Sequence, residues 1–350
     1  MTGAPAASTF TMTPIGRVLA VAETEVDGPQ GAEAVLQAAA GLAQRHGAAL
    51  EMLACMVPPA DLSVIARAAG TTPEACLQAL SKVRQQAMEE IAARALPAKQ
   101  PDVHMAIGNP FIEVVRHVVH NQIDMVVKTA RPLSGLHGVF FASTDQHLLR
   151  KCPCPVWLRA PDAALEPRTI VAAVDVDLSD AREPETLTQL NCRVIETALR
   201  LGSLEHGVVH VLHAWEALGE GLIWTFAADI DPGAAAQRYL REVEAERRRS
   251  LAALLQPFRT RAAATPRLTE SLVRGPTRSV IAEQAKRLSA DLIVLGTVAR
   301  TGLRGVIIGN TAEDILNSVD CSVVAVKPEG FVSPVAPEAR VPIDQQPPMD

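Results

Sequence analysis

The 350-residue chain contains no apolar run that approaches the ~20 residues of a membrane-spanning helix, so we expect no membrane span. It also lacks an excess of basic residues. Its formal net charge is −6 at pH 7, which argues against DNA binding, because that function normally requires a basic face. The N-terminus has no basic segment followed by an apolar core, so we expect no signal peptide and a cytoplasmic location.

Residue clusters typical of metal sites and of catalysis are lacking too. The six cysteines are scattered, and the close pair Cys152 and Cys154 has no second pair to complete a tetrahedral site. We interpret these cysteines as reduced structural thiols. The nine histidines show no spacing of a known ligand set, and neither a Ser-His-Asp nor a paired-carboxylate arrangement is evident. The sequence therefore predicts no metal centre and no catalytic residues.

The chain does contain many hydrophobic residues, 48%, and a length that suits two domains with large cores. Short apolar segments alternate with helical segments along it. The strands predicted for the first part of the chain are 18–22, 50–57, 103–107, 124–127 and 155–158. This alternation predicts an α/β fold, with a parallel, doubly wound sheet that carries helices on both faces.

The same pattern then repeats. Residues 169–175 match residues 17–23, and Asp291 matches Asp124. We therefore expect two tandem domains. Their predicted limits are 16–160 and 165–331, with a flexible tail at 1–15 and a Pro-rich tail at 332–350.

Residues 291–316 carry the strongest ligand-binding motif of the chain. A buried strand ends at Gly296, a long loop follows, and Gly309 and Asn310 lead to Thr311, a residue typical of a helix N-cap. Such a loop directs backbone N–H groups, hydroxyl groups and a helix N-terminus to one point. That arrangement holds phosphate groups in many proteins.

This stretch resembles the nucleotide loop of the universal stress proteins, in which the order is Gly, two residues, Gly, nine residues, Gly, and then Ser or Thr. Gly296, Ala299 and Gly309 keep that spacing. Ala299 stands at the place of the middle glycine, and Asn310 at the place of the Ser or Thr. The ending Val326-Lys327-Pro328 is similar to that of the tandem, E-type members.

The resemblance implies a five-stranded parallel sheet in each domain, in the order 3-2-1-4-5. It also implies that the second domain binds ATP or a related adenine nucleotide, with Mg²⁺ as a further candidate. In that binding mode Asp175 meets the adenosine and Ala214 meets the base through its backbone. The phosphate residues implied are Gly296, Thr297, Ala299, Gly309, Asn310 and Thr311.

The first domain resembles the degenerate half of such tandem proteins. Lys128 stands where the second domain has Gly296, and Ser143-Thr144-Asp145 replaces the glycine-bearing turn. We therefore expect nucleotide binding in the second domain alone. Lys128 either fills the missing phosphate position or points to solvent.

Three functions stay open: a stress-response regulator that binds nucleotide, a regulatory or scaffold module that contacts an unknown protein partner without nucleotide, and a slow nucleotide hydrolase. The apolar segment 221–226 fits core packing better than a pocket or contact surface. Universal stress proteins commonly pair through their last strands. A tandem chain can make this contact internally, between 155–158 and 322–326, as a pseudo-dimer that leaves other faces for a homodimer.

Overall fold

The computed structural model describes most of the chain. The residues described are 14–130, 143–179, 181, 183–202, 206–226, 231–259, 266–297, 315 and 318–335. The first repeat comprises β1 (Arg17–Ala22), α1 (Thr24–His46), β2 (Ala49–Met56), α2 (Leu62–Ala68), α3 (Pro73–Ala95), β3 (Asp102–Ile107), α4 (Pro110–Asn121), β4 (Met125–Thr129), α5 (Ser143–Lys151) and β5 (Val156–Arg159). The second repeat comprises β6 (Thr169–Ala173), α6 (Pro184–Leu201), β7 (Val208–Trp215), α7 (Glu220–Phe226), α8 (Pro232–Arg259), β8 (Arg267–Arg274), α9 (Thr277–Arg287), β9 (Leu292–Gly296) and β10 (Ser322–Val326).

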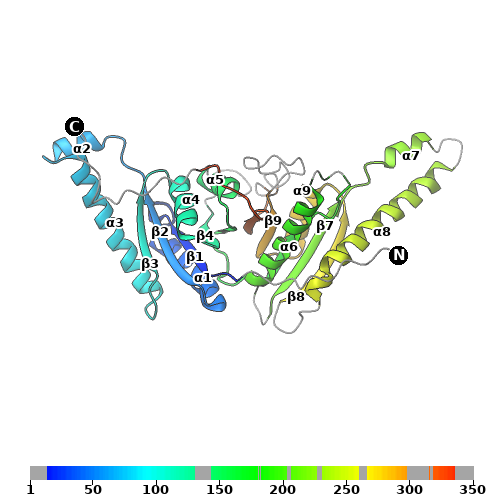
Figure 1. Cartoon of the computed structure of the whole chain (residues 1–350), viewed down its shortest axis with the longest axis horizontal. Coiled ribbons are helices and arrows are strands. Elements are labelled where there is room, and N and C mark those ends of the chain that lie inside the picture. The colour runs from blue at the N-terminus through cyan, green and yellow to red at the C-terminus, as the bar shows by residue number, and fades with distance from the viewer. Residues whose placement is uncertain are drawn as a thin grey trace.

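All ten of these strands form one sheet, in the order β3-β2-β1-β4-β5-β10-β9-β6-β7-β8. Within each repeat the neighbouring strands are parallel, which confirms the predicted order 3-2-1-4-5. The two repeats join where β5 pairs with β10 in antiparallel fashion, with Trp157 opposite Val324. The predicted internal pairing of the last strands is therefore confirmed. Figure 1 shows the result, with α3 and α8 at opposite ends of the molecule.

Burial follows the place of each strand in the sheet. The central strands β4, β5 and β10 are buried along their whole length, because helices cover both faces of a parallel sheet. The edge strands β3 and β8 are only partly buried. The central strands are accordingly mainly apolar, with Lys128 and Arg159 near their carboxyl ends, whereas His104 and Glu270 lie within the edge strands.

The hydrophobic core forms two layers, one on each face of the sheet, and each layer continues across the junction of the repeats. One layer includes Leu36 of α1 and Ile195 of α6. The other includes Val114 of α4 and Ile281 of α9. The two repeats therefore share their cores as well as their sheet.

The predicted match between Asp124 and Asp291 is visible in their hydrogen bonds. The Asp124 carboxylate accepts the backbone N–H groups of Gly16 and Arg17, at 2.7 and 2.9 Å. The Asp291 carboxylate accepts those of Arg168 and Thr169, at 2.8 and 2.9 Å. Each aspartate thus anchors the start of the first strand of its own repeat.

Helix α7 corrects one expectation. The segment 221–226 was predicted to pack in the core, but Leu222 is 59% exposed and Phe226 is 81% exposed. Leu218, just before the helix, is 82% exposed. Helix α7 lies at the end of α8 remote from the sheet (Figure 1), away from both core layers of the described residues. No helix in the described segments is long and apolar enough to cross a membrane.

Candidate functional site

The carboxyl ends of β6 and β9 form the topological switch point of the second repeat. The chain leaves β6 towards β7 on one side, while β9 lies on its other side, so the connections diverge above these two strands. Open α/β sheets bind ligands at such a point. Ala173 pairs with Leu295, so Asp175 and Thr297, each two residues beyond this pair, lie at the same edge of the sheet.

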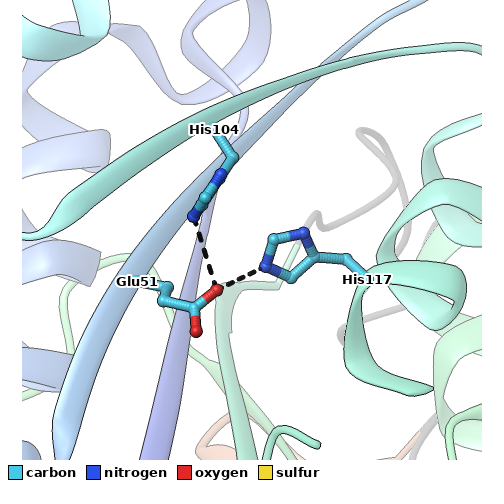
Figure 2. A group of neighbouring side chains, drawn as sticks. All are labelled: Glu51, His104 and His117. Carbon is cyan, nitrogen blue, oxygen red and sulfur yellow. Dashed lines mark hydrogen bonds and ion pairs between the residues drawn. The ribbon is translucent and has the colours of Figure 1, made fainter. Parts of the chain in front are cut away.

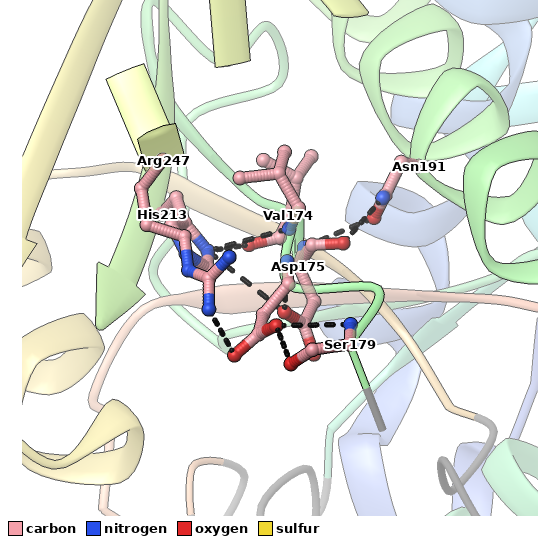
Figure 3. Close-up of polar contacts among 8 residues, drawn as sticks. Val174, Asp175, Ser179, Asn191, His213 and Arg247 are labelled. Atoms are coloured by element: carbon pink, nitrogen blue, oxygen red, sulfur yellow. Dashed lines mark hydrogen bonds and ion pairs between the residues drawn. The ribbon is translucent and has the colours of Figure 1, made fainter. Parts of the chain in front are cut away.

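The backbone of Asp175 is held in place by the side-chain amide of Asn191. Its N–H donates to Oδ1 of Asn191 at 3.0 Å, and its carbonyl oxygen accepts from Nδ2 of Asn191 at 2.6 Å. Oδ1 of Asp175 accepts the N–H of Asp177 at 3.1 Å, while the side chain is 33% exposed. Figure 3 shows Asn191 reaching Asp175 from α6. The carboxylate thus caps a local N–H and still reaches the surface of the switch point.

His213 is the member of this site that sequence reasoning missed. It is 2% exposed, and its Nδ1 lies 3.1 Å from the Val174 carbonyl oxygen and 4.0 Å from Oδ1 of Asp175. Burial lowers the pKa of His213, and the nearby Asp175 offsets only part of this effect, which favours the neutral imidazole. Nδ1 has two backbone neighbours, the Val174 carbonyl oxygen at 3.1 Å, which can only accept, and the Val176 N–H at 3.5 Å, which can only donate. The shorter contact favours a proton on Nδ1, and in that tautomer Nε2 carries an acceptor lone pair.

Nε2 of His213 is buried without a hydrogen-bond partner in the part of the chain that the structure describes. Buried polar atoms normally have a partner, so an orphaned acceptor at a switch point indicates a place for a donor. The only sequence signal was the position of His213 directly before Ala214, near the end of a buried strand.

Arg247 closes the other side of this network. It comes from the charged stretch 237–250 of α8. Its Nη2 lies 2.8 Å from Oδ2 of Asp177, and only 13% of its side chain is exposed. Oδ1 of Asp177 accepts from the N–H and the hydroxyl of Ser179. Because Arg247 binds the other oxygen of this carboxylate, the segment after β6 is linked to α8 (Figure 3).

Ala214 lies in β7 and is 7% exposed. The Trp215 carbonyl accepts from Gly275 on the β8 side, whereas the Leu212 carbonyl accepts from Val174 on the β6 side. Neighbouring residues of a parallel strand direct their backbone groups to opposite sides. The N–H and C=O of Ala214 therefore face the β6 side, beyond the last β6–β7 pair, Ala173 and Leu212.

Gly296 has a packing role that the loop motif does not reveal. A Cβ at this position would lie 2.7 Å from Cδ2 and 2.9 Å from Cγ of Leu190 in α6. The absence of a side chain thus lets α6 approach the end of β9. Helix packing alone therefore accounts for a glycine at this position, and no bound ligand is needed to explain it.

The hydroxyl of Thr297 is engaged within the protein. It accepts from Nζ of Lys327 at 2.5 Å, and it lies 3.4 Å from the Val326 carbonyl oxygen. Nζ of Lys327 also donates to the Leu149 carbonyl oxygen of the first repeat at 2.5 Å. Burial lowers the pKa of Lys327 to about 7. The amine beside Thr297, where the loop begins, therefore loses its proton readily near neutral pH.

The remaining loop residues fall outside the described part of the chain. They are Ala299, Gly309, Asn310 and Thr311, together with Arg300 and Arg304.

The equivalent edge of the first repeat is filled by an ion-pair cluster. Nζ of Lys128 lies 2.9 Å from Oδ1 of Asp145 and 3.0 Å from Oε2 of Glu23, the residue that matches Asp175. Burial lowers the pKa of Lys128, but Asp145 and Glu23 outweigh it and raise the pKa above its ordinary value. The alternative that Lys128 points to solvent is wrong, because the residue is 0% exposed.

The strand register also corrects the match proposed for Lys128. Lys128 pairs with Val21, and Leu295 pairs with Ala173, the residue that matches Val21. Lys128 therefore corresponds to Leu295, and Thr129 corresponds to Gly296.

Cys152 and Cys154 lie together between α5 and β5, with their Sγ atoms 3.6 Å apart. Both are free thiols and both are buried. Burial raises the pKa of Cys154 well above its ordinary value, so this thiol is protonated at neutral pH. The described geometry agrees with the structural interpretation of the pair.

Two doubly wound repeats joined through their last strands define a tandem α/β protein with a ligand-type switch point in its second repeat. The model of the Usp family, the Universal stress protein family, matches residues 25–158 and 185–327. The chain is 30% identical over 229 residues to Universal stress protein E of Salmonella typhi, covering 65% of this chain and 68% of that protein. It is 31% identical over 236 residues to the Universal stress protein E homolog of Haemophilus influenzae, covering 63% and 72%.

Solved structures agree with the fold. A functionally unknown protein from Pseudomonas aeruginosa PAO1 matches with a TM-score of 0.58 at 22% identity, covering 91% of this chain and 94% of that one. A putative universal stress protein from Pseudomonas aeruginosa UCBPP-PA14 matches with a TM-score of 0.56 at 22% identity, covering 91% and 95%. The chain belongs to the universal stress protein family. It is a tandem member of the E type, with a general role in the stress response.

Gly296→Ala tests the packing role of the glycine. We expect a loss of about 1–3 kcal/mol in the free energy of unfolding, because the new methyl group overlaps Leu190. Gly41→Ala in α1 is the control, since a Cβ there meets nothing within 4 Å and alanine favours a helix. Urea unfolding followed by circular dichroism gives both values. Equal stability of the two variants would contradict the packing account.

The lowered pKa of Lys327 predicts that the stability of the protein depends on pH. Below pH 7 the amine is protonated in both folded and unfolded chains; between its folded pKa of about 7 and its ordinary value of 10.5, only the unfolded chain binds the proton. The free energy of unfolding should therefore rise with pH across this window, by about 1.4 kcal/mol for each unit of pKa difference. Urea unfolding from pH 7 to pH 10 measures it.

Lys327→Met should remove this rise, whereas Lys286→Met, at an exposed position of α9, should keep it. Parallel pH profiles for Lys327→Met and the wild type would show that Lys327 is charged throughout the range.

Proposed function

We propose that the protein binds ATP or a related adenine nucleotide at the switch point of the second repeat and acts as a stress-response regulator. The observation that carries the proposal is the orphaned, buried Nε2 of His213 beside Asp175. An acceptor at this place suits a donor such as the exocyclic amino group of adenine. The family relationship favours the same ligand class.

Each residue would contribute by its chemistry. The partly exposed carboxylate of Asp175 would accept hydrogen bonds from ribose hydroxyl groups, and the backbone of Ala214 would meet the base. Gly296 and Thr297 would begin the phosphate loop that continues through Ala299 to Thr311. Mg²⁺ would accompany the phosphate oxygens, since hard oxygen ligands suit it.

The first repeat supports the assignment by contrast. Glu23 and Asp145 would repel a phosphate group at the equivalent edge, and Lys128 already neutralises them. Breaking a buried ion pair to admit a ligand would leave an uncompensated charge, which costs about 3–5 kcal/mol. We therefore propose that one nucleotide binds per chain, with hydrolysis that is slow at most. Phosphate release under excess ATP measures that rate.

The phosphate loop provides the test of binding. Gly309→Val would place a branched side chain where a phosphate must sit, and we expect at least a tenfold loss of ATP affinity, about 1.4 kcal/mol. Ala299→Gly restores the family residue and should maintain or increase the affinity. Isothermal titration of the full-length chain with Mg-ATP measures both. Gly302→Ala, outside the matched spacing, is the control.

The nucleotide proposal would be overturned if millimolar Mg-ATP leaves the melting temperature of the wild type unchanged and Ala299→Gly fails to create a response. A ligand that binds the folded state must raise its stability.

A second candidate function is a scaffold that acts through protein contacts, and α7 favours it. Leu218, Leu222 and Phe226 present apolar side chains to solvent on one projecting arm (Figure 1). Exposed apolar groups of this kind are typical of interaction surfaces. A second copy of the chain is the simplest occupant.

The oligomeric state tests this candidate. If α7 joins two copies, Leu222→Ser with Phe226→Ser should shift a dimer to a monomer in light scattering at micromolar concentration. Val83→Ser, an exposed apolar position on α3, should leave the mass unchanged. A wild-type chain that is already monomeric at this concentration would exclude the self-association surface.

A further inference from the structure

Three potential metal ligands meet within the first repeat, far from the switch point of the second. Glu51 comes from β2, His104 from β3 and His117 from α4. The register pairs Leu53 with His104, so Glu51, Leu53 and His104 all lie on the face of the sheet that α4 covers. Figure 2 shows both imidazole rings directed towards the same carboxylate.

The distances among the three groups suit a metal ion. Nε2 of His117 lies 2.7 Å from Oε2 of Glu51, and Nε2 of His104 lies 3.5 Å from the same oxygen. All three ligand atoms lie within 4.8 Å of one another. Ligands of tetrahedral zinc, at about 2.0–2.2 Å from the ion, are roughly 3.3 Å apart, so side-chain shifts of a few tenths of an ångström to about 1 Å would suffice.

The surroundings give the cluster both a rigid base and an entry path. His117 is fully buried and Glu51 is 7% exposed, next to Leu53 and Val114 of the core. The His104 side chain is 36% exposed, so an ion can enter from the β3 edge. Nη1 of Arg17 lies 3.4 Å from the other carboxylate oxygen, Oε1, and leaves Oε2 to the two imidazoles.

We propose that Glu51, His104 and His117 form a binding site for a divalent transition metal, with Zn²⁺ as the best fit. Two imidazoles and one carboxylate leave one tetrahedral position for water, as in known three-ligand zinc sites. Binding replaces the hydrogen bond between His117 and Glu51, and any proton on Nε2 of either histidine moves to Nδ1 or to solvent. The site is independent of nucleotide binding in the second repeat.

Cobalt provides the spectroscopic test, because four-coordinate Co²⁺ has strong visible bands. The full-length chain is prepared without a histidine tag, stripped with a chelator and titrated with Co²⁺ and then Zn²⁺. We expect one Co²⁺ per chain, displaced by Zn²⁺, without the near-ultraviolet charge-transfer band of a cobalt–thiolate bond. That band would instead assign the metal to the cysteines and overturn the proposal.

His104→Gln is the decisive variant, because its position at the surface spares the buried Glu51–His117 pair. We expect the affinity for Co²⁺ to fall at least tenfold while the circular dichroism spectrum stays unchanged. His120→Gln, at an exposed position of α4 outside the cluster, should bind as the wild type does. Unchanged affinity in His104→Gln, or no binding by the wild type at micromolar Co²⁺, would show that the cluster is an ion pair only.

Discussion

The antiparallel pairing of β5 with β10 is the constraint on which the rest of the structure depends. It gives each short, apolar last strand a partner on both sides, and it removes two edges that would otherwise invite aggregation. Both core layers continue across it. Side chains reinforce the junction, since Lys327 of the second repeat donates to Leu149 of the first, and Ser322 accepts from the backbone of Ala160.

The two repeats share this frame but differ in charge at their carboxyl edges. In the first, Glu23, Lys128 and Asp145 satisfy one another in a buried cluster. In the second, Asp175 stays partly exposed and the buried His213 keeps an acceptor without a partner in the described chain. Because ligands exploit unmet hydrogen-bonding capacity, the second edge is suited to binding and the first to stability.

The fold was largely predictable because strand burial and the repeat leave a periodic signal. Asp124 and Asp291 could be matched by spacing, and their hydrogen bonds agree. The sites were less accessible to sequence reasoning, because their members are distant in the chain. His104 and His117 reach Glu51 only through strand register and α4 packing, so their spacing carried no signal. The exposure of α7 was missed because its apolar composition resembles that of a core helix.

Photo-crosslinking with 8-azido-ATP tests the central claim most directly, that nucleotide binds at the second repeat alone. The account predicts that labelled peptides come from the second repeat, including the segment 206–226 that contains His213 and Ala214, and that excess ATP abolishes the labelling. Labelling of residues 16–130, or labelling that excess ATP does not displace, would contradict it.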